Sequence, residues 1–125
     1  MITLLLVDDN DKVRGALRSM LEGFDEISVI GEAADGLTAF PLAMSLRPAV
    51  VLMDFGMARM SGVEATRRIK GLLPDTVIIG LSVHKDRHIE SAMLAAGASA
   101  FLPKDIHPGE LIAVIRDHTE FAARP

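Results

Sequence analysis

Polar residues with complementary chemistry follow four apolar segments of this chain. Asp8 and Asp9 follow the first of these segments, Asp54 a central one, Ser82 the next and Lys104 the last. If the segments are parallel strands of one sheet, their carboxyl ends meet at one edge, and ligands bind at that edge. Residues that lie about fifty positions apart in the sequence would then share one site.

These residue types suit a divalent cation and a phosphoryl group. Three carboxylates close together repel one another, so at least one of their pKa values rises unless a cation neutralises them. Oxygen ligands without His or Cys favour a hard cation, and Mg²⁺, or Mn²⁺ in its place, fits this set. A lysine adds a second positive charge, and phosphoryl transfer depends mainly on positioning and charge neutralisation. An aspartate can itself be the nucleophile and form an aspartyl phosphate.

Each of these residues, taken alone, also has a simpler interpretation. The run 8–11 could be only a helix N-cap, and Asp54 only a turn residue. Ser82 could be a cap, Lys104 a solvated side chain and Phe101 part of the core. The joint occurrence of these residues at four strand ends favours a site over these separate interpretations.

The elements that must position these residues alternate along the chain. Continuous apolar runs indicate buried parallel strands, and amphipathic segments between them indicate helices. The expected strands are 3–7, 27–33, 49–53, 77–81 and 100–102. The expected helices run from the caps at 8–11 to Gly23, then over 37–46, 62–73, 86–96 and 108–118. Pro41 predicts a late start or a kink in the second helix. Right-handed crossovers then give an open α/β sheet with helices on both faces.

Composition bounds the possible functions. A chain of 125 residues fits one domain, and 50% hydrophobic residues exclude a disordered chain. The absence of cysteine excludes disulfides, thiolate metal sites and a cysteine nucleophile. A net charge of −4 argues against direct nucleic-acid binding, and no apolar run is long enough to cross a membrane. The N-terminus does not resemble a signal peptide, so we expect a cytoplasmic location.

The combined motifs resemble a bacterial response-regulator receiver domain, the phosphoacceptor module of two-component signalling. The resemblance runs from Leu4 to about His118. The motifs that carry it are Val7-Asp8-Asp9, then Leu52-Met53-Asp54 with Met57, Met60 and Gly62, then Leu81-Ser82, and finally Phe101-Leu102-Pro103-Lys104. The segment 96–105 is similar to receivers that are joined to LuxR-type helix-turn-helix domains.

The resemblance implies a role for each residue of the acidic site. Asp54 would be the phosphoacceptor. Asp9 would bind Mg²⁺ directly and Asp8 largely through water, while Asp54 and the backbone carbonyl of Gly56 would complete the protein ligands. Lys104 would pair with Asp54 and then with the phosphoryl oxygens.

The remaining implied roles concern switching and access. Ser82 would hydrogen-bond the phosphoryl group and draw its loop inward, and Phe101 would be the aromatic switch that follows. Val83 and His84, which come directly after the hydroxyl, could modulate access to the site.

The resemblance also implies a fold, a function and partners. The fold would be flavodoxin-like, with strand order 2-1-3-4-5, a receiver domain over 1–120 and a tail or linker start over 121–125. The domain would be a signalling module rather than an enzyme, because only its own phosphorylation and dephosphorylation are self-catalysed. The partner would be a histidine kinase or phosphotransfer protein. The output surface would be the fourth helix, fifth strand and fifth helix, roughly 84–118, and this surface could form a homodimer.

Other functions remain open at this point. The chain could be a stand-alone receiver or the regulatory part of a DNA-binding regulator. A small phosphatase or phosphotransferase with an aspartate nucleophile is possible, although haloacid-dehalogenase-type enzymes carry an aspartate where Gly56 stands here. A flavodoxin-type electron carrier would lack Trp and Tyr for stacking on a flavin. A receiver that never takes phosphate is disfavoured, since all the required side chains are present.

Overall fold

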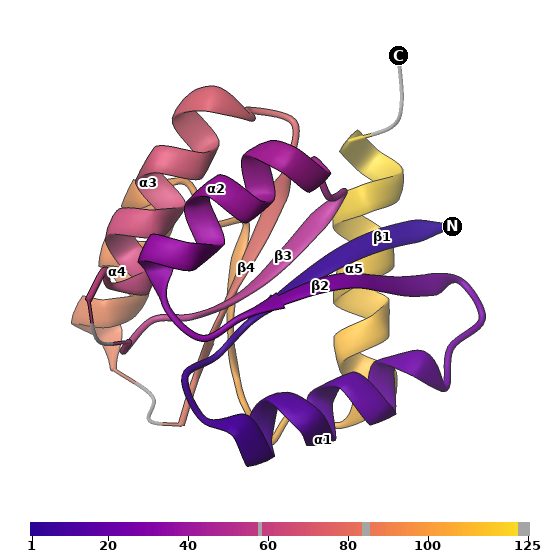
Figure 1. Cartoon of the computed structure of the whole chain (residues 1–125). Coiled ribbons are helices and arrows are strands. Elements are labelled where there is room, and N and C mark those ends of the chain that lie inside the picture. Colours follow the sequence, from indigo (N-terminus) through magenta and orange to yellow (C-terminus); the bar gives the residue numbers. More distant parts are fainter. Residues whose placement is uncertain (58, 84–85, 123–125) are drawn as a thin grey trace.

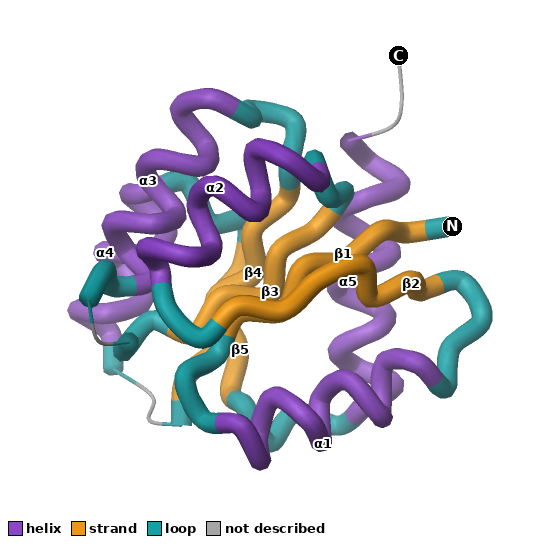
Figure 2. The backbone as a smooth tube through the Cα atoms, in the orientation of Figure 1, coloured by secondary structure: helices purple, strands orange, loops and turns teal. Residues whose placement is uncertain are grey.

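The chain folds into one parallel sheet between two layers of helices (Figures 1 and 2). The computed structural model describes residues 1–57, 59–83 and 86–122, with the side chains of 120–122 left aside. The strands are β1 (Ile2–Val7), β2 (Ile27–Ala33), β3 (Val50–Asp54), β4 (Val77–Ser82) and β5 (Ala100–Pro103). Their order in the sheet is β2-β1-β3-β4-β5, and every neighbouring pair is parallel. The predicted flavodoxin-like fold and strand order are therefore confirmed.

Five helices connect and follow the strands. They are α1 (Asp11–Glu22), α2 (Gly36–Leu46), α3 (Gly62–Leu72), α4 (Arg87–Ala96) and α5 (Pro108–Ala122). Short polar side chains cap the first four helices by accepting hydrogen bonds from free backbone N–H groups. The capping residues are Asn10, Asp35, Ser61 and Asp86. Gly97 ends α4 with φ of 119°, a left-handed conformation that glycine adopts readily.

The two faces of the sheet bury separate cores. Successive side chains of a strand point to opposite faces, so β1, β3 and β4 contribute to both cores. Helices α1 and α5 cover one face, where Leu17, Leu21 and Leu111 are buried. Helices α2, α3 and α4 cover the other face, where Ala43, Ala65 and the larger Met93 are buried (Figure 1). Burial on both faces explains why the central strands are continuous apolar runs in the sequence.

Two expected helix boundaries differ from the structure. Pro41 lies inside α2, which begins at Gly36, so the expected late start is wrong, while the alternative of a kink stays a prediction. The side chain of Asp35 caps the helix by accepting from the N–H of Thr38, and this cap sets the start ahead of the proline. Helix α5 extends to Ala122, beyond the expected end near 118. The division at 120 between a domain and a tail stays a prediction, and 123–125 lie outside the described residues.

Across the described residues, no helix is both long enough and apolar enough to span a membrane.

Candidate functional site

The predicted site residues gather at the carboxyl edge of the sheet. Asp8 follows the last residue of β1, and Asp54 and Ser82 are the last residues of β3 and β4. Lys104 follows the last residue of β5. Because β1, β3, β4 and β5 lie in this order, the residues that end them face one another across the same rim.

The three predicted carboxylates form an acidic cluster. Asp8, Asp9 and Asp54 each offer one oxygen, and these oxygens all lie within 4.8 Å of one another. Asp8 and Asp54 are buried, with 1% and 4% exposure, whereas Asp9 is exposed. The cluster therefore has two oxygens fixed in the protein and one at its mouth, and such an all-oxygen set suits a hard divalent cation.

Lys104 lies between the two buried carboxylates. Its ammonium Nζ is 2.7 Å from Asp8 Oδ2 and 3.4 Å from Asp54 Oδ2, and its side chain is only 12% exposed. Asp8 Oδ2 has no hydrogen bond of good geometry among the described residues, so its contact with Lys104 is an ion pair. The ammonium thus neutralises part of the acidic cluster from the β5 side.

The charges in the site shift two pKa values upward. Burial raises the pKa of Asp54, and the nearby charge of Asp8 adds to this, although Lys104 and the N–H of Gly56 oppose it. Burial by itself lowers the pKa of Lys104, but the close contact with Asp8 and the charges of Asp54 and Asp8 outweigh burial and raise it. The surroundings of Asp54 therefore disfavour its charged form, and a bound cation or a covalent group on the carboxylate would relieve this.

Backbone hydrogen bonds fix the loops around the cluster. The N–H of Gly56 donates to Asp54 Oδ1 at 3.3 Å, and the N–H of Lys104 donates to the carbonyl of Ser82 at 2.8 Å. Ser82 is buried with 2% exposure. The second contact ties the hydroxyl-bearing end of β4 to the lysine-bearing end of β5. The predicted roles of Ser82 in phosphoryl binding and of the Gly56 carbonyl as a ligand stay predictions.

Phe101 lies beside the site rather than in it. It is half-buried on β5, pairs with Gly80 of β4, and meets Phe55 edge-to-face with ring centroids 6.5 Å apart. A Cβ on Gly80 would lie 2.7 Å from the Phe101 ring and 2.8 Å from Met93. Glycine at this position therefore leaves the space that the ring occupies, and no sequence pattern predicted this requirement.

An open groove runs from the site toward α1. Its volume is about 400 Å³, and its lining residues are Val13, Ala16, Leu17, Val83, Lys104 and Asp105. Val83 is 71% exposed at its rim, next to the site, so its predicted influence on access stays a prediction. His84, which carried the same prediction, lies outside the described residues.

Sequence reasoning assigned no structural role to two residues that shape the site. A Cβ on Gly62 would lie 2.1 Å from the carbonyl oxygen of Asp54, so only glycine lets α3 begin this close to β3. Arg14 was also missed, and its Nη1 donates to the carbonyl of Asp8 at 2.6 Å. Glycine in a matched motif was a usable signal for Gly62, whereas an arginine on a polar helix face gave none.

An open parallel α/β sheet with a carboxylate cluster, a buried hydroxyl and an ammonium at its carboxyl edge defines a domain equipped to hold a cation beside an aspartate. The comparison with known families agrees with this description. Residues 4–116 match the response regulator receiver domain family, and the chain belongs to that family. It is a receiver domain of response regulators, as the sequence motifs indicated.

Curated relatives include response regulators and a transcriptional regulatory protein. The response regulator UvrY of Escherichia coli (strain K12) is 40% identical over 116 residues, which cover 93% of this chain and 53% of that protein. The transcriptional regulatory protein LiaR of Bacillus subtilis (strain 168) is 41% identical over 116 residues, 93% of this chain and 55% of that one. The chain thus spans about half the length of these relatives.

Solved structures show the same architecture. A two-component response regulator of the LuxR family from Aurantimonas sp. SI85-9A1 matches with a TM-score of 0.91 and 30% identity, covering 97% of this chain and 86% of that one. The response regulator domain of Thermotoga maritima CheB matches with a TM-score of 0.89 and 30% identity, covering 100% and 99%. The expected likeness to LuxR-type receivers is confirmed by the first of these structures.

Proposed function

We propose that Asp54 accepts a phosphoryl group from a histidine kinase or phosphotransfer protein in a Mg²⁺-dependent reaction. The observation that carries this proposal is the convergence of three carboxylate oxygens within 4.8 Å, with the Lys104 ammonium 3.4 Å from Asp54. A buried nucleophile between a cation site and an ammonium is the arrangement that phosphoryl transfer requires. Family membership supports the same assignment.

The donor set fits Mg²⁺. Asp8, Asp9 and Asp54 supply carboxylate oxygens only, and the Gly56 carbonyl would add a neutral one. The partial exposure of the cluster leaves room for the waters that Mg²⁺ retains when proteins bind it. When bound, the cation neutralises and orients the phosphoryl oxygens. Mn²⁺ prefers the same ligands and would substitute.

The chain's own groups carry out the transfer step. A carboxylate oxygen of Asp54 attacks phosphorus and forms an O–P bond, while the P–N bond to the partner's histidine breaks. The bonding electron pair stays on the imidazole, which leaves as a neutral ring when its other nitrogen carries the proton. Lys104 and the Ser82 hydroxyl stabilise the charge that spreads over the phosphoryl oxygens. The groove beside Lys104 gives the partner access from the α1 side.

Phosphorylation would shift an equilibrium between two surfaces. A phosphoryl oxygen draws Ser82 toward Asp54, and Phe101 follows because β4 and β5 are hydrogen-bonded neighbours at Gly80 and Phe101. The surface formed by α4, β5 and α5 would then change and could pair with a second copy. Size-exclusion chromatography with light scattering, with and without beryllofluoride as a phosphoryl mimic, tests this dimer.

The decisive experiment is phosphorylation by acetyl phosphate. The wild-type chain with Mg²⁺ should gain one acid-stable, base-labile phosphoryl group, seen by intact-mass spectrometry. Asp54→Asn and a sample with EDTA should gain none. Stoichiometric labelling of Asp54→Asn would disprove the assignment. Multiple turnover of a phosphorylated metabolite without a stable adduct would instead support the small aspartate-nucleophile enzyme.

The names of the relatives support a proposal for the output. UvrY is named a response regulator and LiaR a transcriptional regulatory protein, and this chain covers about half of each. We propose that the chain acts as the regulatory part of a transcription regulator, with a stand-alone receiver as the alternative. Direct nucleic-acid binding by this domain is not expected at a net charge of −4, and an electrophoretic mobility shift assay tests this. The cytoplasmic location stays a prediction.

A further inference from the structure

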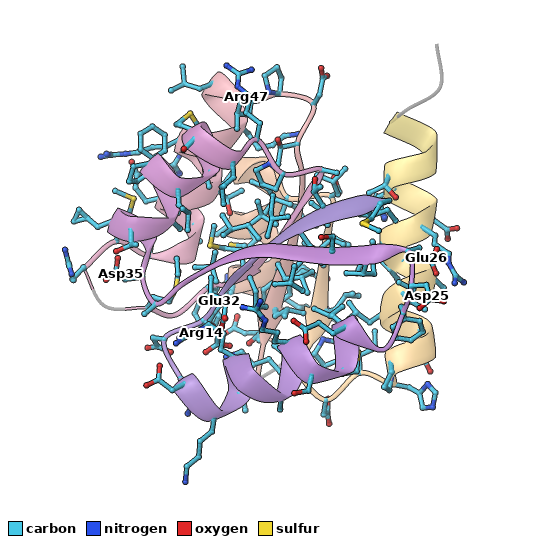
Figure 3. The ribbon with its side chains drawn as sticks, turned by 45° about the vertical axis from the view of Figure 1, so that its right-hand side comes forward. Arg14, Asp25, Glu26, Glu32, Asp35 and Arg47 are labelled. Atoms are coloured by element: carbon cyan, nitrogen blue, oxygen red, sulfur yellow. The ribbon has the colours of Figure 1, made fainter. Side chains whose placement is uncertain are left out.

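Arg14 of α1 contacts three parts of the molecule around residues 8–10, the acidic loop that leads from β1 to α1. Its Nη1 donates to the backbone carbonyl of Asp8 at 2.6 Å, its Nε donates to Glu32 Oε1 at 3.0 Å, and its Nη2 donates to Asp11 Oδ1 at 2.7 Å. Figure 3 shows Arg14 and Glu32 reaching toward one another from α1 and β2. The Arg14 side chain is only 17% exposed, so these contacts are partly shielded from water. A planar fork with five donors suits such a junction, and a lysine could not make it.

Asp8 is held at every polar group, and Arg14 supplies one of these contacts. The Asp8 N–H donates to the carbonyl of Ala33 at 3.1 Å, and Asp8 Oδ1 accepts from the N–H of Asn10 at 2.8 Å. The carbonyl of Asp8 belongs to the peptide bond that leads to Asp9. The orientation of this peptide plane sets the direction in which the Asp9 side chain leaves the backbone.

Asp9 depends on this backbone more than the other two carboxylates do. Within the part of the chain that the structure describes, no hydrogen bond or ion pair holds the exposed Asp9 carboxylate. Asp8 and Asp54, in contrast, are buried and both contact Lys104. Among the described residues, it is therefore the main chain that sets the position of Asp9 at the mouth of the cluster.

We propose that Arg14 is a positioning residue of the acidic site, which fixes the Asp8–Asp9 peptide so that the Asp9 carboxylate is preorganised for a divalent cation. Arg14 acts through hydrogen-bond geometry rather than through its charge. Glu32 and Asp11 already neutralise the guanidinium, and the repulsion between a bare arginine and a metal ion would weaken binding. Outer contacts that orient metal ligands commonly change metal affinity by about 10–100-fold when they are removed.

Arg18 offers a matched control. It lies one helical turn after Arg14, also pairs with Glu32, and donates to Glu22 at 2.7 Å, but within the described residues it makes no hydrogen bond or ion pair with residues 8–10. Arg14→Gln and Arg18→Gln remove the same charge from the same ion-pair network. Only the first removes the hydrogen bond to the Asp8 carbonyl.

The test is calorimetric titration of the apo protein with Mg²⁺ alone, at one salt concentration. We expect Arg14→Gln to raise the Mg²⁺ dissociation constant by about 10-fold or more, and Arg18→Gln to leave it within about 2-fold. A purely electrostatic role predicts the opposite sign for Arg14→Gln, because loss of a nearby positive charge would tighten cation binding. If Arg14→Gln does not fold by circular dichroism, Arg14→Lys keeps the charge, loses the fork, and should still weaken binding.

The inference rests on the proposed metal site, and the titration separates the two. If the wild-type chain binds no Mg²⁺, the proposed metal-dependent function fails. If the wild type binds Mg²⁺ and Arg14→Gln binds it equally or more tightly, the role of Arg14 is wrong and the metal site stands. Equal weakening by Arg14→Gln and Arg18→Gln also overturns it, because that result reflects general loosening of α1.

Discussion

Lys104→Met is the substitution that tests the electrostatics of the site most directly. Methionine keeps most of the aliphatic stem and removes the ammonium that lies 2.7 Å from Asp8 and 3.4 Å from Asp54. At an effective dielectric constant of about 20, two such contacts are worth roughly 6 and 5 kcal/mol before desolvation is subtracted. Among the described residues, the substitution then leaves no cation in contact with the two buried carboxylates.

The loss of stability has an upper bound that depends on pH. The variant can escape the repulsion by placing a proton on Asp54, whose pKa is already raised by burial and then by Asp8. Holding a proton on a carboxyl of ordinary pKa costs about 4 kcal/mol at pH 7 and about 1.5 kcal/mol at pH 5. We therefore expect Lys104→Met to lower the free energy of unfolding by about 3 kcal/mol at pH 7, close to the value for breaking a buried ion pair.

The pH dependence has a definite sign. The folded variant binds more protons than the unfolded chain near neutral pH, so its stability rises as the pH falls, by up to about 1.4 kcal/mol per unit. The difference from the wild type should shrink between pH 7 and pH 5. Lys104 itself has a raised pKa, so its contribution is complete below an ordinary lysine pKa and is lost only as the pH rises through the raised value.

The assay is urea unfolding without metal, followed by far-UV circular dichroism because the chain has no Trp or Tyr. Lys12→Met is the control, since Lys12 is exposed and its loss should change stability by less than about 0.5 kcal/mol. Saturating Mg²⁺ should stabilise Lys104→Met more than the wild type, because a cation no longer competes with the ammonium for Asp8. A stability loss that is independent of pH, or an equal response to Mg²⁺, would refute this reasoning.

Three further tests concern the packing and ion pairs around the site. Thr66→Val should be neutral or stabilising by up to about 1 kcal/mol in the same unfolding assay, because the buried Thr66 hydroxyl has no hydrogen-bond partner in the described structure. Thr76→Val removes a buried donor to a backbone carbonyl and should instead lower the free energy of unfolding by about 1–3 kcal/mol. A loss of stability in both variants would contradict the argument. Gly62→Ala should lower the free energy of unfolding by more than about 1 kcal/mol and slow labelling by acetyl phosphate, since the new Cβ would meet the Asp54 carbonyl at 2.1 Å. A melting curve identical to that of the wild type would contradict this, because it would show that α3 can shift to make room. Arg18 and Arg14 lower the pKa of Glu32. The free energy of unfolding of the wild type should therefore exceed that of Glu32→Gln above an ordinary glutamate pKa of about 4.3, and this difference should disappear as the pH falls. A difference that grows in acid would exclude the ion pairs as its source.

Much of the fold could be predicted because its signals are local. Both-face burial makes β1, β3 and β4 continuous apolar runs, and capping residues mark the starts of α1, α3 and α4. The exception at Pro41 is also physical. The cap at Asp35 and the packing of Ala39 and Ala43 on the sheet favour a helix through the proline, and propensity alone does not report such packing.

For the candidate site too, local sequence signals predicted one part and tertiary packing decided the other. The sequence by itself determined which chemical groups are available and that strand ends carry them, because residue types and element boundaries depend on the local sequence. Only the tertiary structure decided that Lys104 lies closer to Asp8 than to Asp54, that Gly80 makes room for Phe101, and that Arg14 reaches the Asp8 carbonyl. These contacts join residues on different strands and helices, so their distances depend on how the sheet packs against its helices and not on any local pattern.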